Sequence, residues 1–131
     1  MEKAGPRKTT IKHFRDLDVY QKSFGLAMKI FQITKTFPAE EKYALTDQIR
    51  RSSRAVCSNL AEGWRKRKYR AAFCNKLTDA MQEASETQSW LEFCRACHYI
   101  DDELFLTMDK DYESVIGMLS RMEQQADKFC Y

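Results

Sequence analysis

Apolar residues recur at steps of three and four over most of this chain, which is the spacing of one face of an α-helix. The clearest run extends over about 25 residues and comprises Phe73, Leu77, Ala80, Ala84, Thr87, Leu91, Cys94 and His98. Two prolines and four glycines are too few for the many turns that an all-β chain of 131 residues needs. The sequence therefore predicts an all-α protein.

Three further segments have helical spacing, and their ends are predicted from capping residues and proline. The first helix should run from about Leu17 to Thr36, with Asp16 as its N-cap. The second should begin at Pro38-Ala39-Glu40-Glu41 and end at Gly63 as its C-cap. The last should follow the acidic residues 101–103. The inward-facing residues are predicted to be Leu17, Tyr20, Phe24, Ala27, Phe31 and Thr34 in the first helix, Leu45, Ile49, Ser52, Val56, Asn59 and Gly63 in the second, and Tyr112, Val115, Leu119, Met122, Ala126 and Phe129 in the last.

Four amphipathic helices joined by short links pack most simply as antiparallel neighbours. Residues 14–131 are therefore predicted to form one antiparallel up-and-down four-helix bundle, and the polar and basic residues 1–13 a disordered arm. The inward stripe of the second helix consists largely of small residues. We expect this helix to pack closely against its neighbours.

Positive charge is concentrated in the first part of the chain. Residues 1–78 contain 18 Lys or Arg against 7 Asp or Glu, whereas residues 79–131 contain 4 against 12. Between residues 50 and 70, Glu62 is the only acid. Cationic side chains release counterions from phosphates, and exposed aromatic rings stack on unpaired bases. The sequence thus predicts a candidate surface for RNA or single-stranded DNA made of Arg50, Arg51, Arg54, Trp64, Arg65, Lys66, Arg67, Lys68, Tyr69 and Arg70.

The same charges permit a second interpretation. The basic first part of one copy could pair with the acidic second part of another copy or of a protein partner. In that case the chain is an assembly scaffold, and Arg50 and Arg51 belong to an interface between subunits.

Five cysteines, at positions 57, 74, 94, 97 and 130, occupy core-like positions. An odd number of thiols is typical of a reducing compartment, so we predict a cytoplasmic protein. Cys94 to His98 spells the CxxCH motif of c-type haem attachment, but Cys94 and His98 continue an apolar stripe and no export signal precedes them. A zinc site would need a second pair of ligands. We predict no metal, no cofactor and, because no long apolar run occurs, no membrane span.

Asn59 and Glu62 lie on or beside the inward stripe of the second helix, where a polar group needs partners. Without a nearby histidine or second acid, they are better interpreted as a hydrogen-bonded network, with Arg51 as a candidate partner, than as catalytic groups. The sequence also has no phosphate-binding glycine loop and no nucleophile elbow. We therefore expect that the protein is not an enzyme.

The segment 37–63, FPAEEKYALTDQIRRSSRAVCSNLAEG, resembles the signature of a known family. It is similar to the bacterial four-helix bundle proteins first noted in intervening sequences of 23S ribosomal RNA genes. Further resemblance is found in the first helix, at Phe14 to Leu17 and Val19 to Gln21, and in the third, at Phe73, Leu77, Ala80, Glu86, Thr87 and Leu91. A glycine common in the third helix of that family is missing from Met81-Gln82-Glu83-Ala84-Ser85.

The resemblance implies a fold and an assembly more firmly than an activity. It implies a four-helix bundle that forms a ring-shaped homopentamer. Its better-understood relatives are accessory variability determinant proteins of retroelements, which are basic pentamers that bind nucleic acid and a reverse transcriptase. A reverse transcriptase partner belongs to those relatives, and nothing in the sequence itself supports one here.

Overall fold

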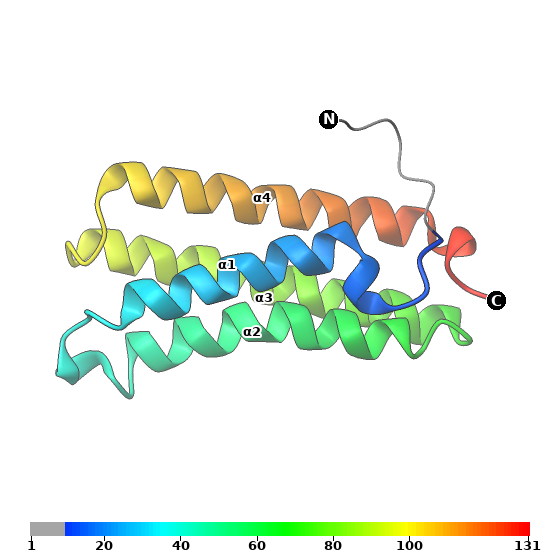
Figure 1. Ribbon diagram of the computed structural model, residues 1–131, viewed down its shortest axis with the longest axis horizontal. Coiled ribbons are helices and arrows are strands. Elements are labelled where there is room, and N and C mark those ends of the chain that lie inside the picture. The colour runs from blue at the N-terminus through cyan, green and yellow to red at the C-terminus, as the bar shows by residue number, and fades with distance from the viewer. Residues whose placement is uncertain (1–9) are drawn as a thin grey trace.

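The computed structural model describes residues 10–131, and these residues form four long helices (Figure 1). They are α1 (Asp18–Thr34), α2 (Leu45–Trp64), α3 (Arg70–Ala96) and α4 (Asp102–Gln124). Three short 3-10 turns accompany them: η1 (Phe14–Asp16), η2 (Ala39–Glu41) and η3 (Ala126–Lys128). No strand occurs within residues 10–131, so the all-helical prediction is confirmed for them. The predicted basic arm, residues 1–13, lies largely outside the described residues.

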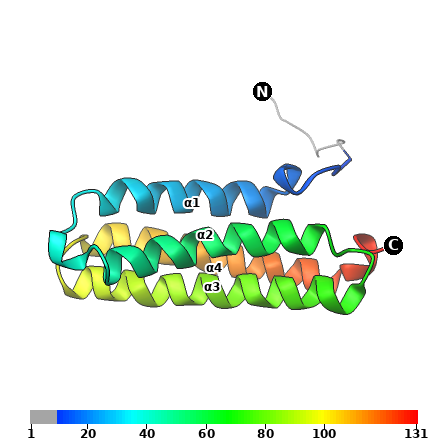
Figure 2. The same cartoon turned by 90° about the horizontal axis from the view of Figure 1, so that it is seen from below.

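Successive helices run in opposite directions and lie side by side, as the two views in Figures 1 and 2 show. α2 packs against α1 and α3, and α4 packs against α3 and α1, whereas α1 and α3 lie at opposite corners. The contact between α2 and α3 is the most extensive in the bundle. This arrangement is an up-and-down bundle whose two connecting ends are both open to solvent.

The core consists of one stripe from each helix. The predicted stripes of α3 and α4 are confirmed almost completely, because period-seven spacing keeps one face directed inward. Fully buried side chains include Phe73, Leu77, Ala80, Ala84, Thr87, Met108, Tyr112, Val115 and Leu119. Small buried residues face each other between α2 and α3, where the Ser52 hydroxyl lies 2.8 Å from that of Thr87.

The stripe predicted for the first helix is confirmed for Leu17, Ala27 and Thr34, which are buried, and wrong for its aromatic residues. Phe24 is 51% exposed, and Tyr20 and Phe31 are only half-buried, while Val19, Ser23, Leu26 and Ile30 are also buried. This helix carries apolar residues on two adjacent faces, and the predicted stripe combines residues of both. Branched aliphatic side chains pack inward instead, which leaves an aromatic face open to solvent.

His98 was predicted to continue the core stripe of α3, and this is wrong. α3 ends at Ala96, and His98 is exposed with φ 63°, in the left-handed region. The amide of His98 donates to the Arg95 carbonyl, and the amide of Tyr99 donates to the Cys94 carbonyl, each at 2.9 Å. This pair of bonds is the Schellman arrangement that closes helices. The imidazole is therefore turned out of the core.

Two predicted caps also differ. Asp16 does not cap α1; its carboxylate accepts from the amides of Lys12 and His13, each at 3.0 Å, and closes η1. The helix start predicted at Pro38 is the separate turn η2, and α2 begins only at Leu45.

Gly63 is not a C-cap but a buried residue within α2. A Cβ at this position would lie 3.0 Å from the Cβ of Lys76 on α3. The missing side chain therefore permits the close approach of the two helices. This is the close packing that the small inward stripe predicted.

Gly63→Ala should lower the free energy of unfolding by about 1 kcal/mol, because forcing atoms into a packed contact costs more than the helix propensity gained. Gly25→Ala is the matched control, since Gly25 lies in α1 with nothing within 4 Å of a Cβ. It should raise the free energy of unfolding by about 0.5–1 kcal/mol. Urea unfolding followed by circular dichroism measures both. Equal stabilisation by the two substitutions would contradict close packing at Gly63.

Candidate nucleic-acid interface

The ten residues predicted to bind nucleic acid do not form one surface. Arg50, Arg51 and Arg54 lie in the first half of α2. The other seven extend from the last residue of α2, Trp64, through the connection to the first residue of α3, Arg70. At 1.5 Å per residue, Arg50 and Arg65 are about 22 Å apart along the helix. The two groups thus occupy different regions of α2, one near the α1–α2 connection and one at the α2–α3 connection (Figure 1).

The three arginines of α2 face different neighbours. Arg50 and Arg54 lie against the ring of Phe31 on α1, with their guanidinium carbons 4.9 and 5.9 Å from its centre. Arg51 lies 3.9 Å from the carboxylate of Asp47, one turn earlier on the same helix. Its positive charge also counteracts the raised pKa of Glu83 on α3, which burial and neighbouring acids cause. Arg51 is thus separated from the other two.

At the other end of α2, the structure removes one aromatic residue from the candidate surface. Trp64 was expected to be exposed and to stack on bases, but it is only 3% exposed and packs edge-on against Phe129. The guanidinium of Arg67 lies 3.7 Å above the Trp64 ring, and its Nε donates to the Trp64 carbonyl at 2.8 Å. Arg67 therefore has a structural contact, and Trp64 cannot reach a ligand.

The remaining residues of the connection are open to solvent. Arg70 pairs with Asp127 near the end of the chain, which neutralises part of its charge. Arg65, Lys66 and Lys68 are exposed, and within residues 10–131 none of them forms an ion pair. Tyr69 is 63% exposed. We call Arg65, Lys66, Lys68 and Tyr69 the basic loop.

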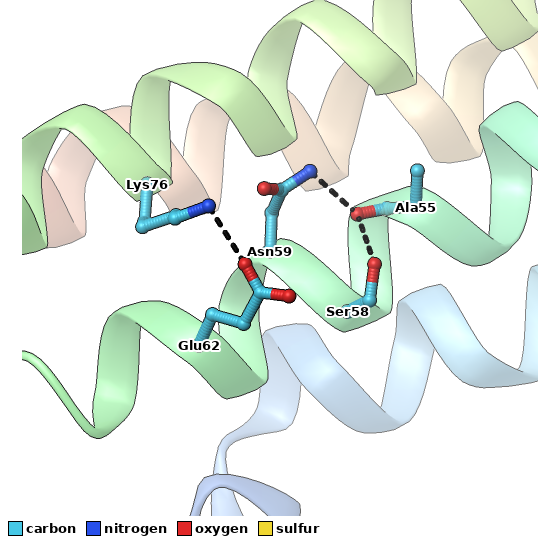
Figure 3. Close-up of polar contacts among 5 residues, drawn as sticks. All are labelled: Ala55, Ser58, Asn59, Glu62 and Lys76. Atoms are coloured by element: carbon cyan, nitrogen blue, oxygen red, sulfur yellow. Dashed lines mark hydrogen bonds and ion pairs between the residues drawn. The ribbon is translucent and has the colours of Figure 1, made fainter.

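Asn59 and Glu62 form separate local contacts rather than the single hydrogen-bonded network that was predicted (Figure 3). The Asn59 amide donates to the Ala55 carbonyl at 2.9 Å, on its own helix. Glu62 is exposed and accepts from the Lys76 ammonium at 2.7 Å, which joins α2 to α3. The expected partner Arg51 is not involved. Lys76 is the residue that also contacts Gly63, so this ion pair lies at the close approach of the two helices.

The CxxCH residues do not converge. Cys94 is buried in the core, where burial raises the pKa of its thiol to about 12. Cys97 and His98 lie outside, beyond the end of α3. Within residues 10–131, no three Cys, His, Asp or Glu side chains are grouped so as to hold a metal ion. All five thiols are unpaired in the structure.

Sequence reasoning missed one group of cations. Lys35 and Lys42 line an open pocket together with Arg50, between the end of α1 and the start of α2. Lys35 directly follows α1, Lys42 directly follows η2 and Arg50 lies in α2, so no local run of charge indicated that they lie together. The sequence signal at this place was the Phe37-Pro38 pair, which predicts that the first helix ends and the chain turns there.

The chain matches the model of the 23S rRNA-intervening sequence protein family over residues 15–121 and belongs to that family. Among curated proteins, none matches. A crystal structure of a protein with unknown function from the S23 ribosomal protein family of Bacteroides thetaiotaomicron is similar to it, with 30% identity and a TM-score of 0.72. The match covers 81% of this chain and 95% of the other.

The resemblance found in the sequence is thus confirmed, and with it the helical fold. No helix in the described part of the chain combines the length and hydrophobicity that crossing a bilayer requires.

Arg67→Ala should lower the free energy of unfolding by about 1–2 kcal/mol, because it removes a cation–π contact and a hydrogen bond to a carbonyl. Arg65→Ala, with the same loss of charge at an exposed position, should change it by less than about 0.5 kcal/mol. Thermal and urea unfolding of both variants give the comparison. If Arg65→Ala is the more destabilising, the assignment of Arg67 to structure is wrong.

Proposed function

We propose that this protein is a non-catalytic nucleic-acid-binding protein that contacts RNA or single-stranded DNA through the basic loop. The observation that supports this most directly is the set of exposed, uncompensated cations at Arg65, Lys66 and Lys68 beside exposed Tyr69. Unpaired cations attract phosphates, and an exposed tyrosine offers a ring for base stacking. Five unpaired thiols fit a cytoplasmic site of action.

The position of the loop adds support. The basic loop lies at one end of the bundle, and Arg67, which separates Lys66 from Lys68 in the sequence, is held against the core by its contact with Trp64. A connection fixed in this way presents its cations in a defined arrangement, so less conformational entropy is lost on binding. For a reverse transcriptase partner, residues 10–131 show no comparable residue-level support.

Lys66→Gln/Lys68→Gln should weaken binding of a single-stranded oligonucleotide. The slope of log affinity against log salt should become shallower by about 1.4, because each lost phosphate contact removes about 0.7 for a single strand. Lys29→Gln/Lys110→Gln removes the same charge from exposed positions on α1 and α4 and should leave the slope unchanged. Fluorescence anisotropy at several salt concentrations measures this.

Two outcomes would count against this proposal. An equal loss of affinity in the two double variants would mean that binding depends only on the net charge of the protein and not on the basic loop. If the wild-type protein binds neither single-stranded nor duplex probes at low salt, the proposed function is wrong. Tyr69→Ala tests stacking separately. It should lower the affinity for single-stranded probes more than the affinity for duplex probes, because paired bases are not open to an aromatic side chain.

We also propose that copies of this chain associate head to tail, and the assembly we expect from the resemblance is a ring-shaped homopentamer. Two exposed apolar faces favour this. The α1 face contains exposed Phe24 and Met28 above a groove of about 340 Å³. The α3 face contains Phe93, 53% exposed, and half-buried Trp90 beside a groove of about 240 Å³. Apolar patches of this kind on a folded chain are typical of interfaces.

The two faces differ in place and in charge. α1 and α3 lie at opposite corners of the bundle, so the faces are distinct surfaces (Figure 2). Arg54 lines the groove at the α1 face, whereas Glu41 lines the groove at the α3 face and Glu86 accepts from the Trp90 indole at 3.3 Å. A pairing of two different, complementary surfaces repeats from copy to copy and closes into a ring when the rotation permits.

Phe24→Asp and Phe93→Asp should each reduce the assembly to monomers, because every head-to-tail contact needs both faces. A mixture of the two variants should form heterodimers, since the intact α3 face of one pairs with the intact α1 face of the other. Leu106→Asp, an exposed apolar position that lines neither groove, should leave the mass unchanged. Sedimentation measures the masses. A monomeric wild type, or one variant that keeps the wild-type mass, would contradict head-to-tail pairing.

A further inference from the structure

The open pocket at the corner between α1 and α2 has a strongly one-sided charge. It has a volume of about 420 Å³ and is lined by Phe31, Thr34, Lys35, Phe37, Pro38, Ala39, Lys42, Thr46 and Arg50. Three of these residues are cations, two carry hydroxyl groups and none is an acid. We propose that this pocket binds a terminal phosphate monoester of the nucleic acid. This inference rests on the proposed function, and it assigns to the protein a second site for a chain end.

The first support is the clustering of cations around one ring. The ammonium nitrogen of Lys35 and the guanidinium carbon of Arg50 each lie 4.9 Å from the centre of the Phe31 ring. Arg54 lies 5.9 Å from the same centre. An aromatic face attracts cations and holds them in place without neutralising them. Their full charges therefore remain available to an anion.

Arg50 is oriented by neutral acceptors. Its Nε donates to the Thr34 hydroxyl at 2.7 Å, and its Nη2 donates to the Phe31 carbonyl at 3.4 Å. The Thr34 hydroxyl is itself fixed, because it donates to the Ile30 carbonyl at 2.7 Å. A guanidinium has five N–H donors and is always charged, so Nη1 still has its donors for a ligand. A preorganised arginine of this kind is typical of phosphate recognition.

Within residues 10–131, the cations of the pocket have no carboxylate partner, because no ion pair there involves Lys35, Lys42 or Arg50. Lys42 lies at the rim, with its ammonium 5.3 Å from the ring of exposed Tyr43, and is free to turn toward an anion.

The neighbouring turn η2 contains two acids, exposed Glu40 and half-buried Glu41, and neither of them lines the cationic pocket. The Glu41 carboxylate accepts from the Tyr99 hydroxyl at 2.8 Å and from the Leu45 amide at 3.3 Å. The hydrogen bond to Glu41 raises the pKa of Tyr99 to about 12, so the hydroxyl keeps its proton and remains a donor. Glu41 lines the groove at the α3 face, so its carboxylate is bound away from the cations of the pocket.

A terminal monoester suits this pocket better than a backbone phosphate. A monoester carries a charge of about −1.5 to −2 at pH 7 and has three acceptor oxygens, whereas a backbone diester carries one charge. Three cations that line one pocket without an acid match the more highly charged group. The basic loop lies about 22 Å away along α2, so the two sites would contact different parts of one strand.

The test compares three oligoribonucleotides of one sequence with an internal fluorophore: 5′-phosphorylated, 3′-phosphorylated, and with hydroxyl groups at both ends. Wild-type protein should bind one of the phosphorylated strands about tenfold more tightly, as expected for new charge-assisted hydrogen bonds. Lys35→Gln/Lys42→Gln should remove this preference and leave binding of the unphosphorylated strand nearly unchanged. Both lysines are exposed, so folding is not expected to change. Lys66→Gln/Lys68→Gln removes the same charge from the basic loop. This variant should lower the affinity for all three strands and leave the ratio of the three affinities unchanged.

A second measurement separates the pocket from the proposed function. Inorganic phosphate and a nucleoside monophosphate are titrated while the amide NMR signals of Thr34 and Thr46 are followed; these should shift in the wild type and not in Lys35→Gln/Lys42→Gln. If the protein binds no oligonucleotide but the monophosphate shifts these signals, the proposed function fails and the phosphate pocket stands. If inorganic phosphate alone binds and no phosphorylated strand is preferred, or if neither shifts the signals, recognition of a terminal phosphate is overturned.

Discussion

The close approach of α2 and α3 determines most of what the rest of the molecule can do. Gly63 has no side chain where Lys76 passes, and Ser52, Ala80, Ala84 and Thr87 keep the two backbones near each other along their length. The Ser52 hydroxyl donates to that of Thr87, which in turn donates to the Glu83 carbonyl at 2.8 Å, so neither hydroxyl is buried unpaired. Because this pair is fixed, α1 can pack only on the remaining side of α2, and its aromatic face is left uncovered.

Sequence reasoning identified the core best where one apolar stripe had no competitor. In α3 and α4 one stripe extends along most of the helix, so its spacing alone identified the inward face. The apolar residues outside it, such as Trp90 and Phe93 of α3, form no second stripe of that length. α1 has two, one aromatic and one aliphatic, and only the shape of its neighbours decides that Ile30 faces inward and Phe24 outward. The predictions for Gly63 and His98 were wrong for a related reason. A glycine is suited both to a helix C-cap and to a close contact between helices, and a histidine is tolerated both in a core and at the left-handed position that ends a helix.

For the candidate site, the sequence shows how many cations there are but not which of them are neutralised. Arg70 is paired by Asp127, which lies far away along the chain, and Arg67 is held by Trp64. Lys35, Lys42 and Arg50 are brought together by the turn between two helices, and no local pattern reveals this. The ionic partner of a side chain is a property of the fold, so a run of positive charge in a sequence overstates some binding residues and misses others.

The positions of the apolar faces and of the basic loop connect the proposed assembly with the proposed nucleic-acid binding. The apolar faces lie on the sides of the bundle, at α1 and α3, and the basic loop lies at one end. Association through the sides would leave the ends uncovered and bring the basic loops of neighbouring copies nearer to one another. Like charges repel, and this repulsion opposes assembly most at low ionic strength. A polyanion bound across several loops relieves that repulsion, so in the proposed ring each copy would strengthen nucleic-acid binding and the nucleic acid would in turn stabilise the ring.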